Sequence, residues 1–273
     1  MSNFTKRLIF GALYVLVLGF GILFSKTTFI ALFFLLMLIS LYEFTRMLKL
    51  QSVFPYIIAV FLFIFANALN VKDIPISARV LSEYAGIALF LSFFTAFISI
   101  LFAKKDEVVE HLGKIFLSIV YIAFPFTLIA LIPFINDEFE YVNTTILGVF
   151  ILTWVNDSFA YLVGKNFGKT KLLERISPNK TFEGFFGGMV FTFIASYIIA
   201  LYFTKLSVGT WLVFAGIVSI FGVLGDLIES MFKRNAKVKD SSNFIPGHGG
   251  FLDRLDSVIF VAPFIFIYLL MIT

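Results

Sequence analysis

Long apolar stretches dominate this sequence and leave few folds open to it. A helix needs about 20 mostly apolar residues to cross the hydrocarbon of a bilayer, and about nine segments of the chain approach that length. They lie roughly at 8–24, 28–48, 53–70, 84–103, 114–135, 145–163, 185–204, 209–231 and 255–272. Their apolar residues are continuous rather than alternating, which excludes an outer-membrane β-barrel. The sequence therefore predicts an all-α, polytopic integral membrane protein.

Composition supports this class. Hydrophobic residues make up 60% of the chain and charged residues only 14%, whereas about a quarter of the residues in a soluble domain are charged. The chain contains no cysteine, which excludes disulfides and thiolate metal sites.

The distribution of Lys and Arg predicts the orientation in the membrane, because cytoplasmic loops carry an excess of both. With a cytoplasmic N-terminus, most of the 21 basic residues fall on the cytoplasmic side, and the opposite side keeps only Lys26, Lys72, Arg79 and Lys205. We therefore expect the N-terminus inside and the C-terminus outside. Topology accounts for the net charge of +4, so we expect no nucleic-acid partner.

Polar chemistry is distributed unevenly between two regions. Residues 1–140 are mostly apolar helices with short loops, and we expect them to form a scaffold for lipid access or for a dimer contact. Within this region, Glu43 and Arg46 are three residues apart, which predicts a local ion pair on one helix face. Residues 141–273 carry the ionisable groups within or beside the predicted spans, and we expect them to form a catalytic transmembrane region with cytoplasmic loops.

Several carboxylates lie inside or at the ends of predicted spans. Asp157 lies in the sixth span, Asp226 and Glu229 near the inner end of the eighth, and Asp253 and Asp256 at the start of the ninth. An ionisable group within a span indicates a functional site. Asp226, Asp253 and Asp256 offer the hard oxygen ligands that Mg²⁺ prefers, so we predict a magnesium site there, with other positions left to water and phosphate.

The eighth span continues into a polar stripe. Asp226, Glu229, Ser230, Lys233 and Lys237 are spaced by three or four residues and therefore share one helix face. This face runs from carboxylates within the membrane to cations outside it.

A basic loop is predicted between the sixth and seventh spans, with Lys165, Lys169, Lys171, Arg175 and Lys180. The cytoplasmic excess of cations explains several of these without a further function. Ser177, Lys180 and Thr181 directly precede a helix N-terminus, where backbone N–H groups and a hydroxyl can bind phosphate. The loop lacks the GxxxxGK[ST] pattern, so a P-loop nucleotide site is not indicated.

The stretch from residue 230 to 256 resembles the phosphatidate cytidylyltransferase family, also called CDP-diacylglycerol synthases. The family pattern S-x-x-K-R-x4-K-D, followed by P-x-H-G-G-x-x-D-R-x-D, is met by Ser230, Lys233, Arg234, Lys239, Asp240, Pro246, His248, Gly249, Gly250, Asp253, Arg254 and Asp256. Upstream family features are met by Asp157, Ala160, Tyr161, Ser177, Pro178, Lys180, Thr181, Glu183, Gly184, Gly225, Asp226, Leu227, Glu229 and Ser230. The resemblance covers about residues 145–273.

This resemblance implies an enzyme of phospholipid biosynthesis that transfers CMP from CTP to phosphatidic acid, giving CDP-diacylglycerol and pyrophosphate. The magnesium site expected at Asp226, Asp253 and Asp256 suits this reaction, because a divalent ion can bridge phosphate oxygens of CTP. The remaining residues expected to be catalytic are Lys233, Arg234, Lys239, Asp240, His248 and Arg254. We expect the four cations to bind the phosphates of CTP or lipid and His248 to donate to a phosphate oxygen. The implied substrate-binding residues are Asp157, Ser177, Lys180, Thr181, Glu183, Glu229, Ser230, Gly249 and Gly250, with the last two letting the backbone reach the triphosphate.

The resemblance also implies a homodimer in the inner (cytoplasmic) membrane, with the active site facing the cytoplasm. Other functions stay open. A CTP-dependent lipid-alcohol kinase of the polyprenol kinase type would transfer the γ-phosphate and release CDP. A transporter for anionic lipids predicts ionisable residues on both faces, and the lopsided clustering disfavours it. A docking surface for anionic lipids gives no reason for carboxylates beside the cations.

Overall fold

A computed structural model of the protein describes residues 3–68, 78–102, 108–136, 140–245 and 249–273. In chain order its elements are α1 (Asn3–Phe24), α2 (Lys26–Met47), α3 (Phe54–Asn67), α4 (Ala78–Phe102), α5 (Val108–Ser118), η2 (Ile119–Ala123), α6 (Phe124–Leu131), η3 (Ile132–Phe134), α7 (Asn143–Phe167), β1 (Lys171–Leu173), β2 (Ser177–Thr181), α8 (Phe182–Tyr202), α9 (Val208–Asn235) and α10 (Leu252–Ile272).

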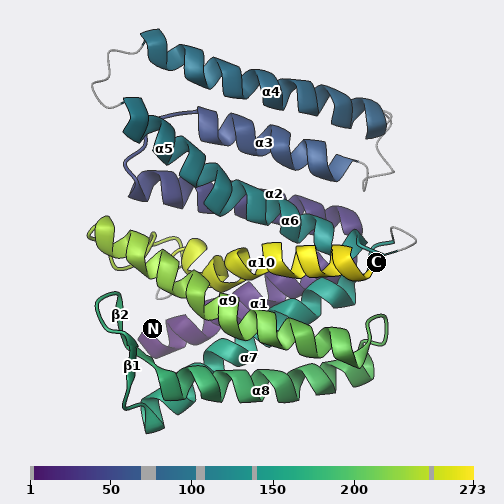
Figure 1. Cartoon of the computed structure of the whole chain (residues 1–273), viewed down its shortest axis with the longest axis vertical. Coiled ribbons are helices and arrows are strands. Elements are labelled where there is room, and N and C mark those ends of the chain that lie inside the picture. The colour runs from purple at the N-terminus through teal and green to yellow at the C-terminus, as the bar shows by residue number, and fades with distance from the viewer. Residues whose placement is uncertain (1–2, 69–77, 103–107, 137–139, 246–248) are drawn as a thin grey trace.

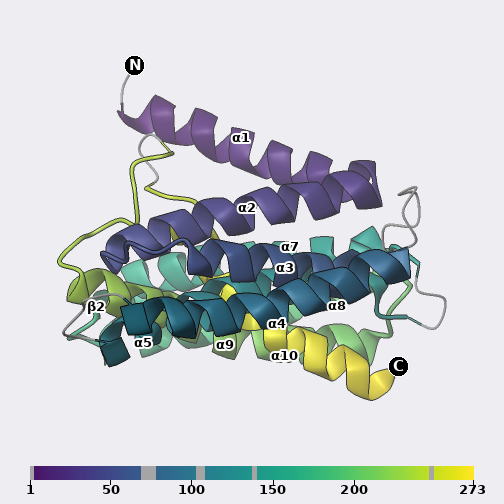
Figure 2. The same cartoon turned by 90° about the horizontal axis from the view of Figure 1, so that it is seen from above.

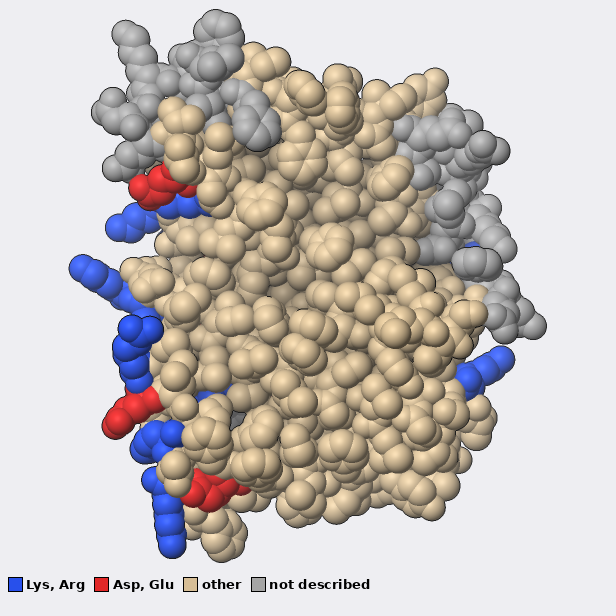
Figure 3. Space-filling view, viewed as in Figure 1, with Lys and Arg blue, Asp and Glu red and all other residues tan. Residues whose placement is uncertain are grey.

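The long helices run side by side between two ends of the molecule (Figures 1 and 2). Figure 1 shows the β1–β2 hairpin and the N-terminus at one end and the C-terminus at the other. Charged side chains gather at the hairpin end, and the middle of the surface is uncharged (Figure 3). An apolar belt with charge concentrated at one end is the surface expected of a helical membrane protein.

Six helical runs are long and apolar enough to cross a membrane: Lys26–Met47, Val108–Phe134, Asn143–Phe167, Phe182–Tyr202, Val208–Asn235 and Leu252–Ile272. Shorter apolar helices lie at Ile9–Phe24, Phe54–Asn67 and Tyr84–Ala96. Every segment expected from the sequence falls on one of these. The all-α membrane class is therefore confirmed, whereas the number of spans and their orientation stay predictions.

The run Val108–Phe134 is not one regular α-helix. It passes through a π-helical turn, η2, and ends in a 3₁₀ turn, η3. Pro125 lies at the start of α6 and Pro133 at the start of η3, where the missing proline N–H interrupts the helical hydrogen-bond ladder. Its most apolar window is 72% buried, more than in any other of the six runs. This run forms the centre of the bundle.

Aromatic side chains join the first half of the chain to the second. Phe44 of α2, Tyr121 of η2 and Phe232 of α9 form a cluster with ring centroids 5.1–5.2 Å apart. Edge-to-face and tilted pairs of this kind stabilise beyond the area that they bury. The cluster holds the C-terminal ends of α2 and α9 together, next to the site described below.

Glycines let the helices of the second half approach closely. A Cβ added to Gly225 of α9 would lie 2.6 Å from the backbone oxygen of Asp256 on α10, and one added to Gly184 of α8 would lie 2.7 Å from that of Ala160 on α7. Small residues at such crossings are typical of membrane helix packing. The first contact places Asp226 and Asp256 beside each other.

Candidate active site

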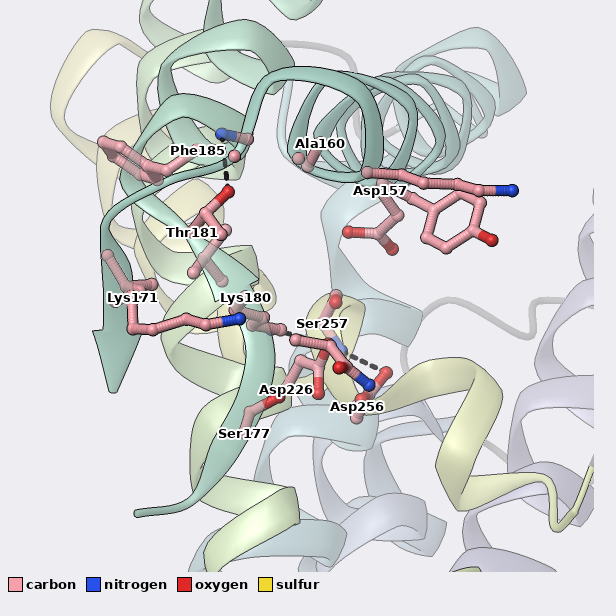
Figure 4. Close-up of a pocket in the computed structure, with 18 of the residues that line it drawn as sticks. Asp157, Ala160, Lys171, Ser177, Lys180, Thr181, Phe185, Asp226, Asp256 and Ser257 are labelled. Atoms are coloured by element: carbon pink, nitrogen blue, oxygen red, sulfur yellow. Dashed lines mark hydrogen bonds and ion pairs between the residues drawn. The ribbon is translucent and has the colours of Figure 1, made fainter. Parts of the chain in front are cut away.

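A cavity of about 820 Å³ opens at the charged end of the bundle, lined by residues of α7, the hairpin, α8, α9, the loop after α9 and α10. Its charged lining residues are Asp157, Lys165, Lys171, Lys180, Asp226, Lys233, Asp240, Asp253, Arg254 and Asp256. Figure 4 shows Asp157, Lys180, Asp226 and Asp256 converging from separate elements. The cavity thus combines cations suited to phosphates with carboxylates suited to a hard cation.

The predicted basic loop folds as a hairpin in which β1 pairs antiparallel with β2. It ends at Thr181, the N-cap of α8, whose Oγ1 accepts a hydrogen bond from Gly184 N at 3.1 Å. Ser177, Lys180 and Thr181 all line the cavity, as do Lys165 and Lys171. The hairpin therefore forms one wall of the site.

Glu183 lies outside the cavity lining. Its carboxylate accepts hydrogen bonds from the backbone N–H groups of Lys169 and Thr170 at 3.0–3.1 Å. These bonds fix the turn between α7 and β1. The substrate contact expected of Glu183 stays a prediction, and the contacts in the structure are those of a residue that shapes the loop.

Asp226 connects the hairpin to α9. Its Oδ2 lies 2.6 Å from Lys180 Nζ, and its Oδ1 accepts a hydrogen bond from Ser230 Oγ at 3.2 Å. Ser230 is not among the lining residues, and its hydrogen bond to Asp226 connects it to one that is.

Lys233 holds two acidic groups. Its ammonium donates to Glu229 on the same helix and, at 2.7 Å, to Oδ1 of Asp253 on α10. Asp253 Oδ2 accepts from the backbone N–H groups of Ser241 at 2.9 Å and Gly250 at 2.7 Å. Both oxygens of Asp253 are therefore bonded to the protein itself.

In the part of the chain that the structure describes, one group of carboxylates could hold a metal ion: Asp226, Glu229 and Asp256 each offer an oxygen within 4.8 Å of the others. Asp253, expected in this set, is not part of the group. Glu229 is fully buried, and its Oε1 has no hydrogen-bond partner among the described residues. A buried carboxylate oxygen left without a donor fits a site for a cation. The position of Glu229, three residues after Asp226 in the polar stripe, was the available sequence signal.

Four other expected site residues lie outside the cavity lining. The Nε of Arg234, an exposed residue, donates to Ile176 O at 3.5 Å, and Lys239 is exposed.

The other two are the glycines of the turn before α10. Gly249 has φ +82°, and an added Cβ would lie 2.5 Å from Asp253 Oδ2. Gly249 therefore makes room for the Asp253 carboxylate, whereas Gly250 donates its backbone N–H to it at 2.7 Å. His248 lies outside the described residues.

Sequence reasoning missed Glu43 of α2. The predicted ion pair with Arg46 is wrong: Glu43 is fully buried, Arg46 is exposed, and the two, both in the described part of the chain, form no salt bridge. Glu43 instead contacts the loop before α10. Its place inside the predicted span 28–48 was a signal of the same kind as those of the other carboxylates.

The helical membrane fold and a cavity carrying both cations and carboxylates define a membrane protein that handles phosphorylated ligands. The sequence matches the cytidylyltransferase family over residues 5–272. It is 35% identical to a phosphatidate cytidylyltransferase of Bacillus subtilis over 98% of each chain. It is also 49% identical, over 46% of this chain and 48% of theirs, to phosphatidate cytidylyltransferases of Staphylococcus haemolyticus and Staphylococcus aureus. The chain belongs to the cytidylyltransferase family. The match extends through the first half, beyond the motifs that carried the resemblance.

Proposed function

We propose that this protein transfers CMP from CTP to phosphatidic acid, giving CDP-diacylglycerol and pyrophosphate. The observation that carries the proposal is the cavity, in which Lys165, Lys171, Lys180, Lys233 and Arg254 share the lining with the carboxylates of α7, α9 and α10. Two polyanionic substrates need such cations to come together. The relatives' names supply the substrate pair.

The reaction asks mainly for alignment of the substrates and for neutralisation of charge on the leaving group. The phosphate of phosphatidic acid is already an anion, so no strong general base is required to attack the α-phosphorus of CTP. Lys180 of the hairpin and Arg254 of α10 approach the cavity from separate elements. We propose that they bind phosphates of the two substrates, with Lys233 holding the carboxylates between them.

We propose that Asp226 and Asp256 hold Mg²⁺, with Glu229 as the third carboxylate. Their oxygens lie close together, and the Oε1 of Glu229 lacks a hydrogen-bond partner among the described residues. When bound, the ion supplies positive charge to phosphate oxygens of the triphosphate. Asp253 contributes by bonding Lys233, Ser241 and Gly250, and thereby fixes the start of α10.

We further propose about nine spans, a cytoplasmic N-terminus and a site that faces the cytoplasm from a bacterial inner membrane. The charged end of the molecule supports this arrangement (Figure 3), since CTP is a cytoplasmic nucleotide and basic residues favour the cytoplasmic face. The homodimer stays a prediction.

The decisive experiment is an assay of the purified protein in mixed micelles with phosphatidic acid, MgCl₂ and CTP radiolabelled at either the α- or the γ-phosphorus. We expect the α-label in CDP-diacylglycerol and the γ-label in free pyrophosphate. Transfer of the γ-label to lipid, with release of CDP, would instead identify a lipid kinase.

The same assay tests the proposed metal site with the variant Asp256→Asn, which retains the size of the side chain but removes its charge. We expect it to lower turnover at least about 100-fold while leaving membrane insertion unchanged. Turnover equal to that of the natural protein would remove Asp256 from the proposed metal site.

A further inference from the structure

Glu43 is a fully buried carboxylate from the first half of the chain that lies against the start of α10. Its Oε1 accepts hydrogen bonds from Ser242 Oγ at 2.5 Å and Phe251 N at 3.1 Å. Its Oε2 accepts from Leu252 N at 2.8 Å and Ser241 Oγ at 3.0 Å. All these donors lie some 200 positions later in the chain, and none belongs to α2.

Two of the donors are the first backbone N–H groups of α10, which have no partner within the helix. The structure records no side-chain hydrogen bond from the N-cap residue, Phe251. Glu43 therefore supplies a cap from another helix, and its negative charge lies at the positive end of the α10 dipole.

The other two donors are the hydroxyls of Ser241 and Ser242, in the loop that joins α9 to α10. Ser241 Oγ also lies 3.0 Å from Asp253 Oδ2. A hydroxyl has one proton to donate, and Asp253 already receives the backbone N–H groups of Ser241 and Gly250. The Ser241 hydroxyl thus lies at the same distance from Glu43 and Asp253 and joins the two carboxylates to one loop.

Gly250 shows how closely this contact is built. A Cβ added there would lie 2.1 Å from Ser241 Oγ and 2.5 Å from Glu43 Oε1, so a side chain at position 250 would displace the carboxylate and the hydroxyl bonded to it. The glycine pair of the predicted phosphate-binding turn consequently admits Glu43 and Asp253 on its two sides.

We propose that Glu43 is a positioning residue for catalysis: it anchors Ser241 and Ser242 after α9 and the first turn of α10, and thereby fixes Asp256 and Arg254 at the cavity. This inference rests on the proposed function. Glu43 does not line the cavity, so it acts through the elements that it holds. The first half of the chain then supplies part of the active-site framework.

The test compares Glu43→Gln and Glu43→Asp with Ser40→Ala. Ser40 lies one turn earlier on α2, is equally buried, and its Oγ has no hydrogen-bond partner among the described residues, so its removal costs no contact. Glu43→Gln keeps the shape but turns an amide NH₂ toward donors, and each charge-assisted bond lost is worth about a 10- to 100-fold change in an equilibrium.

We expect Glu43→Gln to lower kcat about 10- to 100-fold and to raise the Mg²⁺ concentration for half-maximal rate, with KM for CTP changed less. Glu43→Asp should restore part of kcat, and Ser40→Ala should match the natural protein. If Glu43 only stabilised the fold, its substitution would lower the melting temperature. The molecules that remain folded would then need the same Mg²⁺ concentration for half-maximal rate as the natural protein. That outcome, or a Glu43→Gln enzyme kinetically equal to Ser40→Ala, overturns the inference.

A second readout does not depend on activity. Lys237 and Lys239 are exposed in the loop region, so limited trypsin digestion reports whether the loop is anchored. Glu43→Gln should be cut there several-fold faster than Ser40→Ala, and equal rates refute the anchoring. If the natural protein transfers no CMP, the proposed function fails, while the digestion still decides whether Glu43 holds the loop.

Discussion

At the scale of single residues, the site depends on how buried charges are paired. Lys233 lies between Glu229, whose side chain is fully buried, and Asp253, and its own side chain is only 13% exposed. Removing one partner of a buried ionic group leaves an uncompensated charge, which costs more than the pair contributes. The three residues therefore have to be considered as a unit.

This arrangement predicts the behaviour of Lys233→Met. The variant leaves Glu229 and Asp253 without their shared cation and should lose about 3–5 kcal/mol of stability, seen as a lower melting temperature of the purified protein. The double variant Lys233→Met, Glu229→Gln removes one stranded charge and should recover part of the loss. A single variant as stable as the natural protein would show that the carboxylates do not need Lys233.

At the scale of elements, the crossing of α9 and α10 sets the separation of the acidic groups. Gly225 precedes Asp226 and faces the backbone of Asp256 directly. The two helices thus meet at the position where both carry their site carboxylates. The hairpin adds Lys180 and Thr181 from its second strand.

Gly225→Ala tests this crossing. Alanine normally favours a helix over glycine by about 1 kcal/mol, but here its Cβ would lie 2.6 Å from Asp256 O, and overpacking costs about 1–3 kcal/mol. We expect lower thermal stability and at least about tenfold lower turnover, because α9 and α10 must separate. Gly216→Ala is the matched control on the same helix, since the nearest atom to its Cβ is 3.8 Å away. Equal effects of the two substitutions would contradict the explanation.

At the scale of the whole molecule, the hairpin and the link between α8 and α9 lie at opposite ends of the bundle (Figure 1). Because the chain contains no cysteine, single cysteines report their exposure without background. We expect Glu174→Cys, in the hairpin, to react with a membrane-impermeant maleimide only in inverted vesicles. Thr204→Cys, after α8, should react only in intact cells or spheroplasts. The reverse labelling would invert the proposed topology and place the cavity outside.

The sequence alone predicted most of the framework. Apolar stretches indicated the helices because a bilayer imposes a minimum length on any span. Motif spacing indicated Asp157, Lys180, Asp226, Lys233, Asp253, Arg254 and Asp256, and all of these line the cavity. Such residues are recognisable because charge within an apolar span has a high cost and indicates function.

What the sequence determined by itself was therefore the class of fold, the helices and the set of charged residues at one end. Only the tertiary structure decided which of them are partners. It paired Asp253 with Lys233, grouped Glu229 with Asp226 and Asp256, and brought Glu43 to the start of α10. The reason is physical: a hydrogen bond between residues some 200 positions apart depends on the way the helices pack, and helix packing has no local signature in the chain.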